Sequence, residues 1–150
     1  MAANPIARFT ASPLLGAVSI SIAETSLTAP TNYGVLVDAT TASNAIGDKR
    51  DGVRIDYVFA KAVGATTAGM VRMFLYRSAT FHLLGEISVT AVAAPSSTVQ
   101  TWEGSWLTLP NTCATSESNG RVLILEVGDQ LRVTTAIGET FRVFAYGGWF

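Results

Sequence analysis

The chain has 150 residues, of which 49% are hydrophobic and only 14% charged, and its formal net charge is −1. Such a balance offers no basic surface for nucleic acid or an anionic membrane. No stretch reaches the ~18 consecutive apolar residues of a membrane-spanning helix, and the first ten residues show no secretory signal.

Apolar and polar residues alternate along most of the chain, whereas no apolar pattern with helical spacing lasts three turns. Clusters of Gly, Pro, Asn and Asp separate the alternating segments. This pattern predicts an all-β protein, an antiparallel β-sandwich of about eight to ten short strands with little or no helix. The candidate strands are 6–11, 15–23, 33–39, 52–61, 69–78, 80–90, 99–109, 121–127, 130–136 and 138–148.

No linker or change of composition divides the chain. We therefore expect residues 1–14 to form an N-terminal arm and residues 15–150 to form one domain. The arm is stiffened by Pro5, and its residues Arg8 and Phe9 are candidates for contacts with another subunit.

The segment "GVRIDYVFAK" is the clearest of the alternating strands. Strict alternation places Val53, Ile55, Tyr57 and Phe59 on one face, and the charged residues between them on the other.

The strand at 69–78 carries large side chains on both faces. Phe74 and Tyr76 lie opposite Met73 and Leu75, and a strand that is apolar on both sides needs cover on both sides. A second subunit would bury Phe74 and Tyr76 as part of an interface. Alternatively, a long loop of the same chain covers them.

Trp102 and Trp106 are four residues apart in a candidate strand, so they share a face. They could belong to the core, anchor a subunit contact, or form a platform on which a sugar ring stacks.

The C-terminal residues "GGWF" raise a separate question, because chain ends are usually polar and frayed. Either Trp149 and Phe150 fold back onto the core, or another chain covers them. We expect a docking segment, in which Gly147 and Gly148 let the backbone turn and the two rings fill a pocket on a neighbour.

Residues suited to catalysis are scarce. The one histidine, His82, lies in a strand pattern, and the one cysteine, Cys113, lies in a predicted loop. Asp48 and Asp51 could offer oxygen ligands to a cation, but their spacing does not match a calcium loop. We expect no catalytic residue, no bound metal and no cofactor.

Four carboxylates lie in candidate strands, where paired acids could serve sugar hydrolysis. Nothing in their spacing places two of them in one site. They are Asp56, Glu86, Glu103 and Glu126.

The stretches "GVRIDYVFAKAVGATTAGMVRMFLYRSATFHLLGEISVTA" and "LEVGDQLRVTTAIGETFRVFAYGGWF" resemble small virion structural proteins of tailed bacteriophages. The resemblance covers residues 33–150, and its motifs are strand-and-turn patterns without catalytic residues. It implies a capsid-associated β-sandwich of jelly-roll type that decorates or cements the head shell, often as a trimer.

The low charge and the presence of only two lysines also favour a protein that works inside an assembly. We therefore expect a non-enzymatic capsid decoration subunit, located in the virion, that contacts copies of itself and the major capsid protein. The alternatives are a tail or neck component, and a carbohydrate-binding or receptor-binding module that uses Trp102 and Trp106. A small hydrolase is the remaining option.

Overall fold

The computed structural model describes residues 12–39, 52–106 and 122–149, and these residues form nine β-strands and no helix. The strand bounds are β1 Ser12–Ile20, β2 Gly34–Asp38, β3 Val53–Ala62, β4 Gly69–Arg77, β5 Thr80–Val89, β6 Glu103–Ser105, β7 Leu123–Leu125, β8 Gln130–Thr135 and β9 Phe141–Trp149. The all-β prediction is confirmed, and each strand overlaps a candidate from the sequence. The candidate strand at 6–11 and the contact residues Arg8, Phe9 and Phe150 lie outside the described residues.

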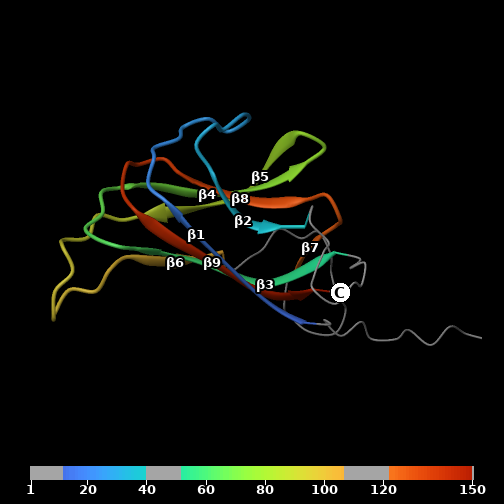
Figure 1. The fold of residues 1–150 in the computed structure, drawn as a ribbon. Helices are drawn as coiled ribbons and strands as arrows, with labels where there is room; N and C mark the ends of the chain where they lie inside the picture. Colours follow the sequence, from blue (N-terminus) through green and yellow to red (C-terminus); the bar gives the residue numbers. More distant parts are fainter. Residues whose placement is uncertain (1–11, 40–51, 107–121, 150) are drawn as a thin grey trace, which may run out of the picture.

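The nine strands form two antiparallel sheets packed against each other, as expected of a β-sandwich (Figure 1). One sheet has the order β1-β9-β3-β6, and β7 pairs with β3 beside β6. The other sheet has the order β2-β8-β4-β5. Because β1 begins at Ser12, residues 12–14 belong to the first strand and not to an N-terminal arm.

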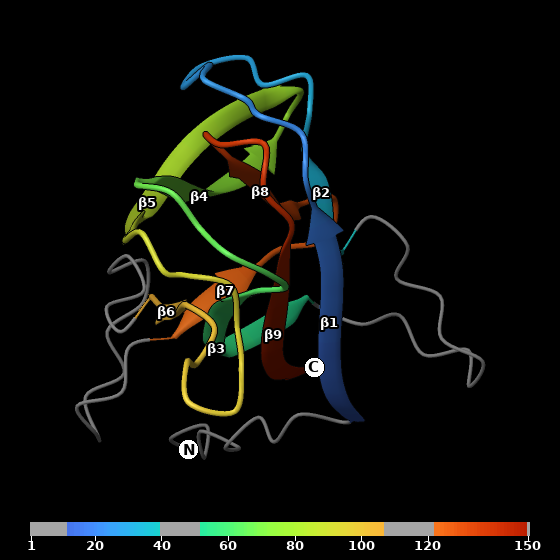
Figure 2. The ribbon, with the colours of Figure 1, turned by 90° about the vertical axis from the view of Figure 1, so that its left-hand side faces the viewer.

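The core lies between the sheets and is filled by alternate residues of each strand, including Ile55, Met73, Leu131 and Phe141. At one side of the sandwich β1 runs next to β2 (Figure 2), where Gly16 leaves room for the Leu36 carbonyl oxygen.

Trp102 and Trp106 close the other side of the sandwich, between β5 and β6. The Trp102 ring packs edge-to-face on Phe141, 5.6 Å between centroids, and the Trp106 ring lies against Gly85. Only 7% of Trp102 and 5% of Trp106 are exposed. Of the three alternatives for these rings, the structure supports the core, and neither ring is placed on the surface as a subunit contact or a sugar platform.

The C-terminal segment is also placed differently from the expectation. Gly147, Gly148 and Trp149 lie in β9, which pairs along its length with β1 on one side and with β3 on the other. The Trp149 ring packs on the core of its own chain. The docking segment predicted for these residues is therefore wrong, because they form the end of a central strand.

Strict alternation fails in β3 because the strand contains a β-bulge. Its register with β9 shifts between Ile55 and Tyr57, which inserts Asp56 as an unpaired residue. Val53 and Ile55 face the core, whereas beyond the bulge Val58 and Ala60 take that position. Tyr57 and Phe59 consequently face outward, so the predicted common face of these four residues is wrong.

The loop 21–33 lies on the side of the four-stranded sheet that faces away from the five-stranded one (Figure 1). The Arg72 guanidinium donates to the Glu24 carbonyl oxygen at 3.1 Å, and the Tyr33 ring packs on Phe81. On this side Phe74 is fully buried, and its ring packs edge-to-face on Phe81 at 5.9 Å between centroids. The alternative of cover by the same chain is therefore right for Phe74, and its expected subunit contact is wrong.

Candidate functional site

The outer face of the five-stranded sheet carries a group of large side chains that no described segment covers. The register places Leu15 beside Tyr146 and Tyr146 beside Tyr57. The next outward row has the order Ala17, Phe144, Phe59 and Ser105 across four strands. We call the aromatic face the outward side chains Leu15, Ala17, Tyr57, Phe59, Phe144 and Tyr146.

In the aromatic face the rings of Phe144 and Tyr146 stack on Phe59, and the ring of Tyr57 packs on Phe59 at a tilt of 33°. The centroids of Phe59 and Phe144 are 4.9 Å apart at an angle of 19°, and those of Phe59 and Tyr146 are 6.0 Å apart at 6°. Tyr57 follows at 5.8 Å from Phe59. Because ring faces in such a stack cover each other, the surface presents mainly ring edges.

These side chains remain accessible to solvent to an unusual degree for their size. Leu15 is 64% exposed, Tyr146 44% and Tyr57 41%. Phe59 and Phe144 are half-buried by their neighbours. A contiguous apolar patch of this kind on a protein surface typically marks an interaction site.

Charged residues border the aromatic face at both ends and mostly neutralise one another. At one end the Arg54 Nε lies 2.6 Å from Asp56 Oδ1. At the other end Lys61 Nζ lies 3.7 Å from Glu103 Oε2. Arg142 is opposite Lys61 in the register and has no ion-pair partner among the described residues.

Two shallow grooves flank the ring stack. One, of about 340 Å³, is lined by Tyr57, Phe59, Glu103, Gly104 and Ser105. The other, of about 240 Å³, lies over β1 and β9. The first groove places a carboxylate and a hydroxyl next to two rings, which is a combination that could bind a small polar ligand.

The outer face of the four-stranded sheet also carries aromatic residues, but these enclose a side chain of the same protein. The Arg132 guanidinium carbon lies 3.4 Å from the ring centroid of Tyr76, 4.1 Å from that of Tyr33 and 5.0 Å from that of Phe81. Its Nε donates to Gln130 Oε1 at 2.8 Å. Tyr76 is half-buried in this cation–π cluster. Its ring therefore packs within its own chain, which is an alternative to the subunit contact predicted for it.

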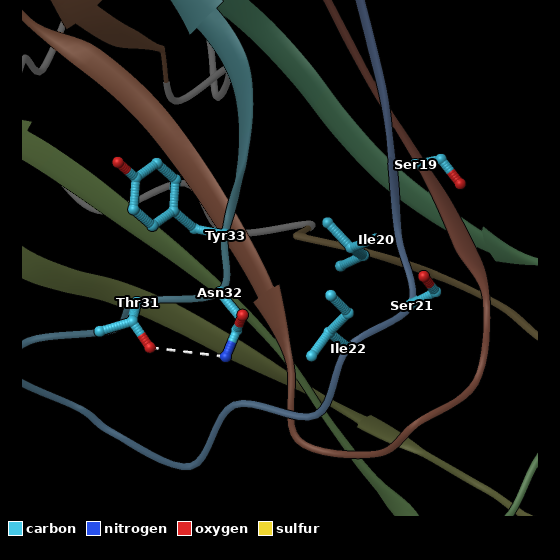
Figure 3. A pocket seen from close by; sticks show the side chains of 7 residues that line it. All are labelled: Ser19, Ile20, Ser21, Ile22, Thr31, Asn32 and Tyr33. Atoms are coloured by element: carbon cyan, nitrogen blue, oxygen red, sulfur yellow. Dashed lines mark hydrogen bonds between the residues drawn. The ribbon is translucent and has the colours of Figure 1, made fainter.

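A third concave site lies where β1 leads into the loop 21–33 (Figure 3). It has a volume of about 220 Å³ and no charged side chain in its wall. Ile20 and Ile22 lie across from Tyr33, and Asn32 donates to Thr31 Oγ1 within the rim. Its lining residues are Ser19, Ile20, Ser21, Ile22, Thr31, Asn32 and Tyr33.

The Glu24 carboxylate holds the loop beside this pocket. It accepts hydrogen bonds from the backbone N–H groups of Asn32 at 3.0 Å, Ser26 at 2.9 Å and Thr31 at 2.7 Å, and from the Thr31 hydroxyl. These donors lower the pKa of Glu24 from 4.5 to about 2. The carboxylate thus fastens the loop through bonds to three backbone N–H groups.

The four strand carboxylates considered for sugar hydrolysis each lie beside a cation. Glu86 accepts from Arg72 Nε at 2.7 Å, and Glu126 lies 3.6 Å from Arg77. Asp56 and Glu103 are paired with Arg54 and Lys61, as described above. Each of these carboxylates is thus engaged in an ion pair.

Other features of the described residues add no chemical centre. They contain no group of three His, Cys, Asp or Glu side chains placed to hold a metal ion. No helix in the described ranges meets the length and apolarity that a bilayer crossing requires. His82 lies in β5 opposite Leu75. Cys113 and the candidate cation ligands Asp48 and Asp51 lie outside the described residues.

No protein-family model, curated protein or solved structure matches this chain. Among the described residues, the aromatic face is the surface best suited to contact a partner. Sequence reasoning missed it in part: alternation in β9 separates Phe144 and Tyr146 from the core residues, but the bulge that turns Tyr57 and Phe59 toward them leaves no clear trace in the sequence.

Proposed function

We propose that this chain is a non-enzymatic virion structural protein, a decoration or cement subunit of a phage head, and that the aromatic face is its contact surface. The sequence resemblance over residues 33–150 supports the virion context. The strand orders β1-β9-β3-β6 and β2-β8-β4-β5 support a jelly-roll topology, an architecture that recurs in viral capsid domains.

The observation that carries the proposal is the difference between the two outer faces. On the four-stranded sheet, the chain covers its own aromatic residues with Arg132 and the loop 21–33. On the five-stranded sheet, Leu15, Tyr57 and Tyr146 remain exposed. The rings of the four-stranded sheet pack around an arginine of their own chain, although Tyr33, Val35 and Leu83 remain 37% to 39% exposed. No described segment covers the rings of the five-stranded sheet, and such a surface is suited to a partner.

The test is the composition of purified particles. Particles of the phage that encodes this chain should be purified on a density gradient, and their proteins should be identified by mass spectrometry. We expect the chain to be present in many copies, and gold-labelled antibody to mark the head in electron micrographs. Label on the tail or neck would favour that location instead, and absence from the particles would refute the proposal.

A second candidate function is carbohydrate binding at the groove beside Tyr57. This residue ends the ring stack and is 41% exposed, and Glu103 and Ser105 lie in the same groove. A glycan array with the wild type and a Tyr57→Ala variant tests it. Binding that disappears in the variant would support a receptor-binding role, whereas the absence of any bound glycan would contradict it.

A further inference from the structure

We propose that the partner of the aromatic face is a second copy of this chain, packed sheet on sheet as a two-fold dimer. The inference rests on the proposed function only in taking this face as the contact surface. It differs from the trimer that the sequence resemblance implies, because a face that packs on itself closes with two copies.

The size of the face meets the requirement of a weak but specific dimer. Its main strands β1, β9 and β3 contain nine, nine and ten residues. Three strands about 30 Å long and about 4.8 Å apart, with the two three-residue strands β6 and β7 along the edge, make a face of roughly 530 Å². Two such faces bury roughly 1,060 Å², which is below the area of standard stable interfaces and in the range of weak, reversible ones.

The charges of the face favour its own copy over a charged partner. Arg54 is paired with Asp56 and Lys61 with Glu103 inside one copy. Two copies can therefore meet without opposing unpaired charges, apart from Arg142 at the border. A strongly acidic partner would find only Arg142 to pair with, and a strongly basic partner would meet carboxylates that are already paired, so either would lose hydration for little gain.

The shape of the central row also suits a two-fold pairing. Across four strands the row reads Ala17, Phe144, Phe59 and Ser105, so two large side chains are bordered by a small one on each side. This order of sizes is the same in both directions. A two-fold axis that crosses the strands at this row brings Phe144 and Phe59 of one copy onto the same residues of the other, with their exposed ring edges in contact. This axis places Arg142 of each copy over Tyr146 of the other and not over a second cation.

The test is sedimentation velocity of the purified full chain over a wide range of concentrations. We expect a reversible dimer for the wild type. The double variant Tyr57→Ser/Tyr146→Ser should raise the dissociation constant of the dimer at least tenfold. Leu83→Ser is the matched control, because Leu83 is also exposed but lies in the other sheet, and it should leave the dimer unchanged.

A second variant guards against loss of folding. Ala17 is an exposed small residue on the face, so Ala17→Asp should fold normally and still place two like charges in the dimer. Unfolding in urea, followed by tryptophan fluorescence, checks that each variant is folded. A photo-crosslinking residue at position 57 should join two copies through peptides of β1, β3 or β9.

Three outcomes would overturn the inference: a wild type that is monomeric at every concentration, a dimer that these variants do not weaken, or a trimer. A monomer that is nevertheless found in particles would leave the proposed function intact and refute only the self-association. If the chain forms the dimer through this face but is absent from the particles, the self-association is supported and the proposed function is refuted.

Discussion

Replacing Gly147 with alanine adds one methyl group where β9 passes the bulge of β3. Gly147 is paired with Ile55, directly before the register shift. A Cβ atom at this position would overlap the Arg54 carbonyl oxygen and crowd the Ile55 backbone. These obstacles are backbone atoms, so no side-chain rotation can make room. The variant has to separate β3 from β9 or lose the bulge.

The expected loss of stability follows from this geometry. Overpacking that side chains can absorb costs about 1–3 kcal/mol. Here the backbone of a strand with neighbours on both sides has to move, so we expect the free energy of unfolding to fall by about 3 kcal/mol or more. A domain with a total stability of about 5–15 kcal/mol would remain mostly folded, but weakened.

Urea unfolding followed by tryptophan fluorescence measures the effect, since Trp102, Trp106 and Trp149 are all partly or fully buried. Gly64→Ala is the matched control, because a Cβ there meets no atom within 4 Å. This control should be neutral or more stable by up to about 1 kcal/mol. If the free energy of unfolding of Gly147→Ala lies within about 0.5 kcal/mol of the wild-type value, the close approach of β3 and β9 is refuted.

Three further predictions concern the covered side of the molecule. Phe74→Ala removes a fully buried ring and should lower the free energy of unfolding by about 3–5 kcal/mol in calorimetry. Glu24 has a folded pKa of about 2 against an ordinary value of 4.5. Its contribution to the free energy of unfolding is therefore present above pH 4.5 and is lost as the pH falls toward 2. In the Glu24→Gln variant, stability should fall less steeply over that pH interval. Ser78 and Ala79 have positive φ angles of 51° and 62° in the β4–β5 turn, and Ser78→Asn/Ala79→Gly should add roughly 1 kcal/mol, seen as a higher Tm.

Each of these three predictions has a clear contrary result. A Phe74→Ala variant as stable as the wild type would mean that the ring is not enclosed by its own chain. Parallel stability profiles of the wild type and Glu24→Gln between pH 4.5 and 2 would show that the loop carboxylate is not held by its donors. An unchanged or lower Tm in the turn variant would show that the turn is not strained.

The strands could be predicted from the sequence because the period of two is a local property. Each described strand overlaps a segment in which apolar and polar residues alternate. The face on which a residue lies is less secure, since a single inserted residue reverses it. Asp56 is such an insertion, and it moved Tyr57 and Phe59 from the predicted core to the aromatic face.

Two other features depend on long-range contacts that a local pattern does not contain. The residues "GGWF" suit both a docking peptide and a buried strand, and only the pairing of β9 with β1 and β3 decides between them for Gly147 to Trp149. Likewise, the large apolar side chains on both faces of β4 have to be buried on both sides. The sequence alone could not decide whether its own chain or another subunit buries Phe74.

The central place of β9 also affects how the protein is made. The ribosome completes β9 after the other eight strands, yet this strand joins β1 to β3. Until it emerges, β1 has no partner in its sheet, and the edges of both neighbours are open to other nascent chains. We therefore expect the five-stranded sheet to form only after synthesis has passed Trp149, and chains released early to aggregate.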